Sequence, residues 1–482
     1  MLWWTLLTVL LTVSSGVVAV KPGFKARITE HALEYANHQA IDALAAMVPK
    51  ASIPDQSGSS GDVDYTLSNI RITGFNKPSS SIKIVPGTGL KWSAANAGVS
   101  LHADWRVKYK KGWFKVSTSG SVDVSANGIG FSVTMALGDD SSGRPAISSA
   151  GCSCSVGGVD IHIHGDIAFI VNLFKHEIEK RVRSMIPGKL CDVVNQQINA
   201  NAENQLKKLK VMTPLANKKF MLDYRLVSAP AFQSAYMETF HKGEITWTAN
   251  PQTPPFSPPA IPPYAPSSNM LYLWVEKYVP QSFLYAAQQN GYLRYNLTTK
   301  DLPPNNRGFL NTTCSGWSQC IGHLLPAVGK KYPNTTVELQ MLSTSLPAVN
   351  MSPGKLEASF AGEIALYANT PSVKKPYLLT LSVSAIFNMS AGIVDQLVKG
   401  NISGSSFKVA VKESAVGPLS SKVMNTMVGL AMKLFIIPEI NKQGEKGFPL
   451  PVTGDIKFLN TQLHILQDAL MIGTDLQYTI KF

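Results

Sequence analysis

The pattern of apolar and polar positions predicts two helical regions and a run of strands in the first half of the chain. Apolar residues recur at helical spacing over 24–48 and a proline follows, which predicts one long amphipathic helix. The Gly- and Ser-rich stretch 56–61 predicts a loop. Residues 65–137 then alternate between apolar and polar, as antiparallel strands with one solvated face do. A second apolar stripe over 167–198 predicts a further helical region, interrupted at Pro187.

The second half repeats this order without repeating the residues. An amphipathic segment at 275–292 comes first, strand-like stretches at 337–342 and 378–387 follow, and a helical stretch at 420–435 ends the series. Helix, strands, helix thus occurs twice, which indicates two domains of similar build and an α+β fold class.

A proline-rich stretch separates the halves. Residues 250–268 read NPQTPPFSPPAIPPYAPSS, and such proline density holds a chain extended and semi-rigid. We therefore predict an interdomain linker at 250–268, an N-terminal domain at 20–249 and a C-terminal domain at 269–482. A chain of this length is too long for one ordinary core.

The first residues predict export from the cell. Residues 1–19 form an apolar run without charged side chains that ends in a small-residue pattern at Ala19, as secretory signal peptides do. A rival membrane span from Met427 is short and broken by Lys433 and Pro438, which favours a buried helix end. We expect a secreted, extracellular protein.

Cations and aromatic residues gather at 101–116. Trp105, Val107 and Tyr109 alternate with charged residues, so a strand would place the two kinds on opposite faces. Lys110, Lys111 and Gly112 are expected to form the turn of a hairpin, with only Asp104 opposing the charge locally. The cationic residues of this hairpin are Arg106, Lys108, Lys110, Lys111 and Lys115, and the aromatic residues that follow its turn are Trp113 and Phe114.

Two interpretations of this hairpin stand side by side. A lysine-rich edge can simply prevent sheets from aggregating. Alternatively, cations beside large rings suit a boundary between water and lipid. The net charge of +13 favours an acidic partner such as nucleic acid, a glycosaminoglycan or an anionic lipid surface, and charge alone does not choose among them.

The cysteines and glycosylation motifs also indicate secretion. Of five cysteines, Cys314 and Cys320 can close a small loop, and Cys152 or Cys154 could reach Cys191 in a loop whose closure contributes roughly 4 kcal/mol. Zinc is a weaker alternative because the spacing lacks a second cysteine pair. The six motifs for N-glycosylation all lie in the second half, which suggests a bare first half; they begin at Asn296, Asn311, Asn334, Asn350, Asn388 and Asn401.

Motifs for catalysis and metal binding are weak or missing. Asp160, His162 and His164 would share one strand face, but an ordinary solvated face explains them better than a metal site, so no metal is expected. The Gly-x-Ser-x-Gly elbow is absent, and His176 and Glu177 lack the second histidine of a zinc protease. Phosphate-loop and dinucleotide-binding patterns are missing too. We therefore expect a binding protein and not an enzyme.

Several segments in the same order resemble one family. They are PGFKARITEHALEYA, VPGTGLKWSAANAGVSL, VDIHIHGDIAFIVNLFKHEIE, NPQTPPFSPP and EKGFPLP. The chain resembles the family of the bactericidal permeability-increasing protein and the lipopolysaccharide-binding protein over essentially its whole mature length. The resemblance implies a boomerang-shaped molecule with two elongated barrel domains, each a twisted antiparallel sheet wrapping long helices, joined by a central sheet. Each barrel would hold an apolar pocket for bound phospholipid, and no other cofactor is implied.

The resemblance also implies a function and a disulfide. In the family a basic N-terminal tip binds lipid A of Gram-negative lipopolysaccharide, and the hairpin cations occupy that position here. The family disulfide corresponds to Cys152 with Cys191, which leaves Cys154 spare. One departure is that the loop after the first helix carries Lys50 against three aspartates, so the cationic surface is concentrated in the hairpin.

We therefore expect a monomeric innate-immune protein that binds lipid A and permeabilises the outer membrane of Gram-negative bacteria. The alternative is a carrier that moves phospholipid or presents lipopolysaccharide to a receptor. A third class, heparin or nucleic-acid binding, would need no lipid, and no specific nucleic-acid partner is expected.

Overall fold

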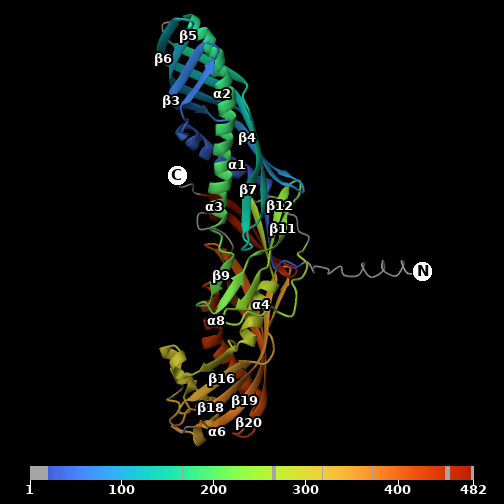
Figure 1. Ribbon diagram of the computed structural model, residues 1–482. Coiled ribbons are helices and arrows are strands. Elements are labelled where there is room, and N and C mark those ends of the chain that lie inside the picture. Colours follow the sequence, from blue (N-terminus) through green and yellow to red (C-terminus); the bar gives the residue numbers. More distant parts are fainter. Residues whose placement is uncertain are drawn as a thin grey trace, which may run out of the picture.

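The protein is elongated and gently bent. Its N-terminal sheet lies at one end, its C-terminal sheet at the other, and a central sheet joins them (Figure 1). This confirms the predicted α+β fold of two domains in which curled antiparallel sheets wrap helices. The computed structural model describes residues 20–165, 168–262, 268–316, 319–371, 374–450 and 456–478. The predicted signal peptide and linker residues 263–267 lie outside these ranges.

Seven antiparallel strands form the N-terminal sheet in the order β2-β3-β5-β6-β7, with β4 paired to β5 and β8 to β6. The strands predicted within 65–137 are confirmed. The predicted loop at 56–61 is wrong, because Gln56–Ser60 pairs with the start of β3. The strands are β2 (Gln56–Ser60), β3 (Val63–Asn76), β4 (Ser79–Val85), β5 (Gly89–Lys111), β6 (Phe114–Asp139), β7 (Pro145–Ser155) and β8 (Gly158–His164).

Local irregularities curl this sheet. Asn96 has a φ of +63° and lies where the pairing of β5 with β6 shifts register. Asn69 has a φ of +52° at a similar shift between β3 and β5. An extra residue in one strand bends that strand and increases its twist, so these positions let long strands wrap a helix.

The wrapped helix is α2 (Ala168–Gln196). Its buried residues recur every fourth position, and on a helix of 3.6 residues per turn such a stripe rotates by about 40° per step. The stripe therefore winds around the helix and meets the curled sheet on several sides. It comprises Ile178, Val182, Ile186, Leu190, Val194 and, in the following π-helical turn, Ile198.

Two predicted features of the N-terminal helices are wrong. The first helix does not begin at residue 24, because Phe24–Thr29 forms strand β1 between two partners of the central sheet. This long-range pairing overrides the local helical spacing. Pro187 does not interrupt α2. The other helical segments here are α1 (Glu30–Met47), η1 (Val48–Lys50), η2 (Gln197–Ala202) and α3 (Glu203–Leu206).

The central sheet takes strands from both halves of the chain, in the order β11-β12-β1-β14-β23-β22. On one of its faces Lys25 and Arg27 are buried, and both pair with Glu238 at 2.9 and 2.8 Å. The strands are β1, β11 (Leu226–Phe232), β12 (Tyr236–His241), β14 (Leu271–Glu276), β22 (Ile456–Leu466) and β23 (Ala469–Tyr478). A small sheet beside it contains β9 (Met212–Leu215), β10 (Phe220–Asp223) and β13 (Glu244–Trp247).

The C-terminal sheet follows the order β15-β16-β18-β19-β20-β21, with β17 paired to β18. Its strands are β15 (Arg294–Leu297), β16 (Val337–Ser343), β17 (Ala348–Ser352), β18 (Lys355–Ala368), β19 (Tyr377–Val394), β20 (Leu397–Ser414) and β21 (Phe448–Pro449). Its helical segments are α4 (Tyr278–Gln289), η3 (Thr299–Asp301), η4 (Pro304–Leu310), α5 (Ile321–Leu324), α6 (Pro326–Lys331), α7 (Ser421–Ala431), η5 (Met432–Ile436) and α8 (Ile437–Gly444). The predicted repeat of helix, strands and helix is confirmed.

Within the part of the chain that the structure describes, one helical stretch, Ser421–Gly444, is long and apolar enough to cross a membrane by length and composition alone. Its residues Met424, Met427, Val428 and Phe435 are buried in the C-terminal core. An apolar face packed in this way is typical of a core helix, as the sequence predicted.

The described part of the linker is docked on the C-terminal domain. Phe256 makes edge-on ring contacts with Tyr278 and Tyr285 of α4, at centroid distances of 5.8 and 6.0 Å. Pro254 and Pro258 are buried. The predicted linker therefore packs against the residues that follow it, and its stiffness stays a prediction.

Candidate functional site

The cationic hairpin forms the end of the N-terminal domain. We call residues 101–116 the tip hairpin. Lys111 pairs with Phe114, so Gly112 and Trp113 alone make the turn. Gly112 has a φ of +58°, and two-residue hairpin loops favour glycine where φ is positive. The predicted turn is therefore right only for Gly112, since Lys110 and Lys111 remain in β5.

The hairpin separates apolar from cationic side chains as its alternation predicted. Trp105 and Val107 are buried, whereas Arg106 and Lys108 are exposed on the opposite face. Lys110 continues this outer face.

The last residue pairs of the hairpin divide the remaining cations between the two faces. Lys115 lies directly opposite Lys110, which places its side chain on the outer face. Lys111 lies opposite Phe114, on the same side as Tyr109. Four cations thus share the outer face, and Lys111 lies among the aromatic residues of the other.

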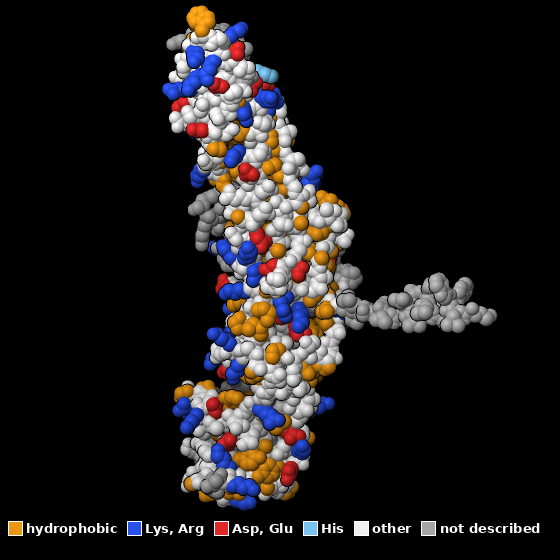
Figure 2. All heavy atoms as spheres, in the orientation of Figure 1, with side chains coloured by type: hydrophobic (Ala, Val, Ile, Leu, Met, Phe, Trp, Pro, Cys, Tyr) orange, Lys and Arg blue, Asp and Glu red, His pale blue; other side chains and the backbone are white. Residues whose placement is uncertain are grey.

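Bare aromatic rings mark the extreme end of the molecule. The side chain of Trp113 is 93% exposed and that of Phe114 is 46% exposed. Phe114 contacts both Trp113 and Tyr109 edge-on, at centroid distances of 6.4 Å. Figure 2 shows hydrophobic atoms protruding at this end, with Lys and Arg atoms close behind them. Such an arrangement offers rings to an apolar phase and cations to anionic groups beside it.

Asp64 on β3 is the counter-charge to the tip. Its carboxylate lies 3.0 Å from the Lys110 ammonium and accepts a hydrogen bond of 2.6 Å from Ser59. The hydrogen bond from Ser59, together with Lys110, lowers the pKa of Asp64. Asp104, the residue expected to oppose the charge, instead accepts a hydrogen bond from Asn69. Sequence analysis missed Asp64 because only the pairing of β3 with β5 brings it to Lys110.

The cations do little for the fold. Lys110 and Lys115 are like charges in directly opposite positions, which destabilises a strand pair. The Lys110–Asp64 pair is about half exposed on both sides, and exposed ion pairs contribute little to stability. The cations therefore serve something other than their own strand pair, and both interpretations, a ligand and protection of the edge against aggregation, fit this.

A small apolar cavity lies beneath α2. Its volume is about 40 Å³, well below the several hundred Å³ of ordinary ligand pockets. A phospholipid would have to separate α2 from the sheet to enter, and its presence stays a prediction. The cavity is lined by Val48, Ala51, Ile53, Ile72, Val99, Leu101, Met185, Ile186, Lys189, Leu190 and Val193.

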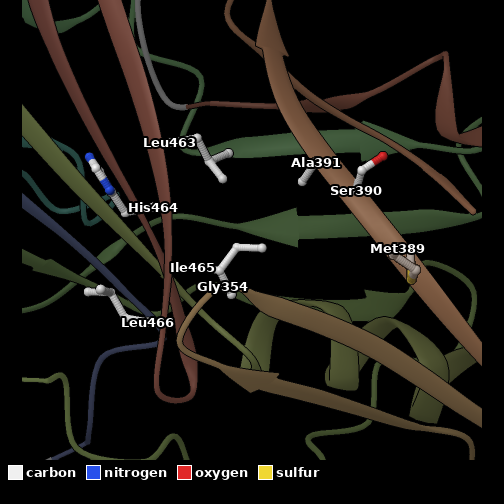
Figure 3. A pocket seen from close by; sticks show the side chains of 8 residues that line it. All are labelled: Gly354, Met389, Ser390, Ala391, Leu463, His464, Ile465 and Leu466. Atoms are coloured by element: carbon white, nitrogen blue, oxygen red, sulfur yellow. The ribbon is translucent and has the colours of Figure 1, made fainter. Parts of the chain in front are cut away.

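A larger, open pocket of about 540 Å³ lies between β22 and β19. Figure 3 shows Leu463 and Ile465 pointing from β22 toward β19, which contributes Met389 and Ala391, while His464 points the other way. Sequence analysis gave no signal for this pocket, because it forms between elements far apart in the chain.

The cysteines pair as expected. Cys152 on β7 is bonded to Cys191 on α2, so the bond ties the wrapped helix to its sheet. Cys314 is bonded to Cys320. Cys154 is free and half-buried, and burial raises the pKa of its thiol to about 11. A thiol that stays protonated at neutral pH is a poor nucleophile.

The candidate glycosylation sites are accessible with one exception. Asn311 is half-buried, whereas the other five asparagines are exposed. Three of the five lie close together on the outer face of the C-terminal sheet. Asn350 and Asn388 both lie opposite Glu357, and Asn401 lies opposite Ser390 on the neighbouring strand. Glycan attachment stays a prediction.

The histidines of β8 lie on the strand face that the sequence predicted. Asp160, His162 and His164 share an exposed face, as predicted. Within the described ranges of the chain, no group of three or more His, Cys, Asp and Glu residues could hold a metal ion.

Comparison with known proteins gives matches along nearly the whole chain. Residues 32–201 match the profile of the LBP / BPI / CETP family, N-terminal domain, and residues 215–478 match that of its C-terminal domain. A bactericidal permeability-increasing protein from Sebastes schlegelii is 29% identical and covers 96% of both chains. A lipopolysaccharide-binding protein from Bos taurus is 28% identical, covering 98% of this chain and 97% of its own. The crystal structure of a lipopolysaccharide-binding protein aligns with a TM-score of 0.65 at 27% identity, over 96% of this chain and all of the other.

Proposed function

The chain belongs to the LBP / BPI / CETP family of lipid-binding proteins through both of its domains, and from this premise we propose that it binds lipid A of Gram-negative lipopolysaccharide. In this proposal it is a secreted innate-immune protein, and its binding permeabilises the outer membrane. The names of its relatives describe lipopolysaccharide binding or increased permeability and no chemical reaction. Binding is therefore the class of function to test.

The tip hairpin carries this proposal. It offers four cations on one face and two exposed aromatic rings at its very end. Lipid A combines phosphate groups with acyl chains, so one surface must offer positive charge and apolar area together. The lysines would pair with the phosphates and displace the divalent cations that bridge neighbouring molecules. Trp113 and Phe114 would then enter the acyl boundary, and the outer membrane would lose order and leak.

Secretion and a monomeric state are part of the proposal. The apolar leader at 1–19, two disulfides and six glycosylation motifs suit an extracellular protein. No nucleic-acid partner is proposed, because the exposed rings of the tip favour a surface with an apolar phase.

Three lysines provide the sharpest test. Replacing Lys108, Lys110 and Lys111 together by alanine should weaken binding to lipid A vesicles roughly 100-fold, since each cation near an anionic surface contributes about 1 kcal/mol. The readouts are vesicle binding across a salt series and dye leakage in the same samples. Binding should fade as salt rises.

The control removes the same charge from the other domain. Lys422, Lys433 and Lys442 are exposed on the helices of the C-terminal domain, and their replacement by alanine should leave lipid A binding unchanged. Unchanged binding in the hairpin variant, or an equal loss in both variants, would remove the hairpin from the mechanism.

The alternative function is a lipid carrier, in which the small apolar cavity beneath α2 would have to widen to take acyl chains. A carrier would move phospholipid between vesicles or present lipopolysaccharide to a receptor, with the acyl chains between α2 and the sheet. Transfer of labelled phospholipid without leakage would support the carrier. Leakage without net transfer would support the permeabilising protein.

A further inference from the structure

A buried carboxyl group lies without a partner where the two domains meet. Glu276, the last residue of β14, is fully buried, and neither of its carboxylate oxygens has a hydrogen-bond partner within the described ranges. Burying a carboxyl group without hydrogen bonds is costly, and burying it in its ionised form costs far more. Packing alone therefore does not explain a glutamate at this position.

Two lysines near Glu276 already have other partners. On β1, Lys25 pairs with Glu238 at 2.9 Å. Lys277, the residue after Glu276, pairs with Asp468 at 2.7 Å. Neither lysine donates a hydrogen bond to Glu276, so both of its oxygens remain without a donor.

The local charges leave Glu276 short of positive charge. Burial is the main cause that raises its pKa to about 8, and the Asp468 carboxylate adds to this effect. Lys21, Lys25 and Lys277 act in the opposite direction and do not outweigh burial. A further cation beside the carboxyl group would allow it to ionise inside the fold.

The N-terminal segment is fixed beside this carboxyl group. Gly23, the residue before β1, accepts a hydrogen bond of 3.0 Å from the Glu276 backbone N–H. Its own N–H donates one of 3.0 Å to the Lys242 carbonyl, and a side chain at Gly23 would approach that carbonyl to 2.7 Å. The chain is thus held tightly at Gly23, next to Glu276.

The predicted cut after Ala19 would bring a new cation within reach. It would leave Val20 as the first residue, three residues before Gly23. Three residues span at most about 11 Å. Val20 is exposed and lies outside β1, so the α-amino group of a chain that begins there can turn toward Glu276.

We propose that Glu276 is the binding site for this chain's own mature N-terminus, the α-ammonium group of Val20. This rests on the proposed secretion, because a signal peptidase must cut after Ala19. Hydrolysis of the peptide bond between Ala19 and Val20 consumes one water molecule, and it leaves a carboxylate on Ala19 and an ammonium on Val20. The ammonium supplies the charge and the N–H donors that Glu276 lacks.

Removal of the leader thereby strengthens the central sheet. β14, with Glu276 at its end, lies between β1 of the N-terminal half and β23 of the C-terminal half. An ion pair from the residue ahead of β1 to Glu276 ties the first segment of the chain to this junction. A precursor that keeps its leader has an amide at Val20 and cannot form the pair.

The test moves the ammonium without removing a charge. The secreted chain is compared with a variant that carries Gly-Ser-Gly-Ser between Ala19 and Val20, so that the same cut leaves four extra residues. Mass spectrometry verifies both N-termini. At pH 7 the extension should lower the equilibrium constant for folding about tenfold, measured by urea unfolding, because an ion pair to a buried carboxylate is lost.

Glu276→Gln identifies the partner of the ammonium. It should weaken the natural chain as much as the extension does and should change the extended chain little, since both alterations remove the same pair. Glu338→Gln, at a buried carboxylate of the C-terminal sheet, is the control. Its effect should add to that of the extension, because the two sites are independent.

Titration of the α-amino group gives a readout that a purely structural role of Glu276 would not move. Pairing should raise the pKa of the Val20 α-amino group above its ordinary range of about 7.7–8.0, and Glu276→Gln should restore that range. Trace acetylation over a pH series, followed by mass spectrometry of the N-terminal peptide, measures this pKa. The stabilisation is then present below about pH 7.7 and is lost as the pH rises through the raised pKa.

The outcomes separate this site from the proposed function. Equal stability of the natural and extended chains, an α-amino pKa in its ordinary range, or a cut at another residue would overturn the site. A loss with Glu276→Gln that adds to that of the extension would assign Glu276 to another cation, such as Lys21, and would overturn it as well. None of these results bears on lipid A binding, which the vesicle assay with the hairpin variant tests separately.

Discussion

Both ends of the molecule are built from curled antiparallel sheets, but the connections between their long strands differ. At the N-terminal end, β5 and β6 continue into the tip hairpin, whose Trp113 is almost fully exposed. At the C-terminal end, the connection from β18 to β19 is held by backbone hydrogen bonds between Ala368 and Pro376 and between Asn369 and Thr336. The described residues of the two connections therefore differ: one presents an exposed ring, and the other is tied by its own backbone hydrogen bonds.

Charge separates the ends as well. Lys375 in the C-terminal connection pairs with Glu338, which is buried. In the tip hairpin Lys110 pairs with Asp64, and both side chains are about half exposed. The Lys375 side chain is itself 39% exposed, so only its partner is buried, whereas both partners are exposed in the pair at the tip. A pair exposed on both sides contributes little and is more easily exchanged for a ligand. This contrast makes the N-terminal end the candidate lipid-binding surface.

The disulfides provide the largest expected difference between the domains. Cys152 and Cys191 are 39 residues apart, whereas Cys314 and Cys320 are 6 apart. In the chain-entropy model these loops contribute roughly 4 and roughly 2 kcal/mol. Replacing both members of each pair by serine should therefore destabilise the N-terminal domain about twice as much as the C-terminal domain. Urea unfolding followed by domain-specific proteolysis measures both losses, and equal losses would contradict the comparison.

The central sheet, where the domains meet, should respond to pH through His241. This buried imidazole bonds to the Tyr224 carbonyl at 2.7 Å and to Thr239 at 2.9 Å, and burial lowers its pKa to about 4. In the unfolded chain the His241 imidazole binds a proton near pH 6.5, whereas in the folded chain it binds that proton only near pH 4. Stability is therefore complete above about pH 6.5 and falls by roughly 3 kcal/mol as the pH drops to about 4.

Substitution distinguishes this effect from the titration of the carboxylates. His241→Gln should flatten the fall in stability between about pH 6.5 and 4, whereas His38→Gln, at an exposed position, should not. The measurement is the free energy of unfolding at several pH values in each variant. Identical slopes in all three proteins would show that His241 does not titrate in this way.

The exposed ring of the tip should matter for binding and not for folding. Trp113→Ala should weaken insertion into lipid A vesicles roughly 30-fold, because burying a large apolar side chain contributes about 2 kcal/mol. Stability should stay unchanged, since the ring is 93% exposed. Ile386→Ala, at an exposed apolar position on the C-terminal sheet, is the matched control. An equal effect of both substitutions would mean that the two ends bind lipid alike.

Local pattern predicted most of the elements, and long-range pairing accounts for the errors. The alternation at Trp105 and Val107 placed the hairpin faces correctly, because the side-chain period of a strand is independent of its partner. The helical spacing from Phe24 predicted a helix where a strand forms, because β12 and β14 pair with that segment from more than two hundred residues away.

The same limit applies to the candidate site. The cations and rings of the tip lie within sixteen residues of sequence and could be identified as a group. Asp64 joins the site only through the pairing of β3 with β5. Register between strands is set by the whole sheet, so sequence near a site does not reveal its cross-strand neighbours.

The smallest expected effect tests whether Asp64 competes with the ligand. Asp64→Asn removes the carboxylate beside Lys110 and should raise affinity for lipid A vesicles roughly threefold, because an exposed ion pair is easily exchanged for a phosphate. Asp104→Asn removes the same charge from a residue that bonds to Asn69 instead, and should have a smaller effect. Vesicle titration at low salt resolves the difference, since screening weakens both effects. If Asp64→Asn weakened binding, Asp64 would hold Lys110 in its productive orientation, and the two ends of the molecule would then share the use of a carboxylate to fix a lysine.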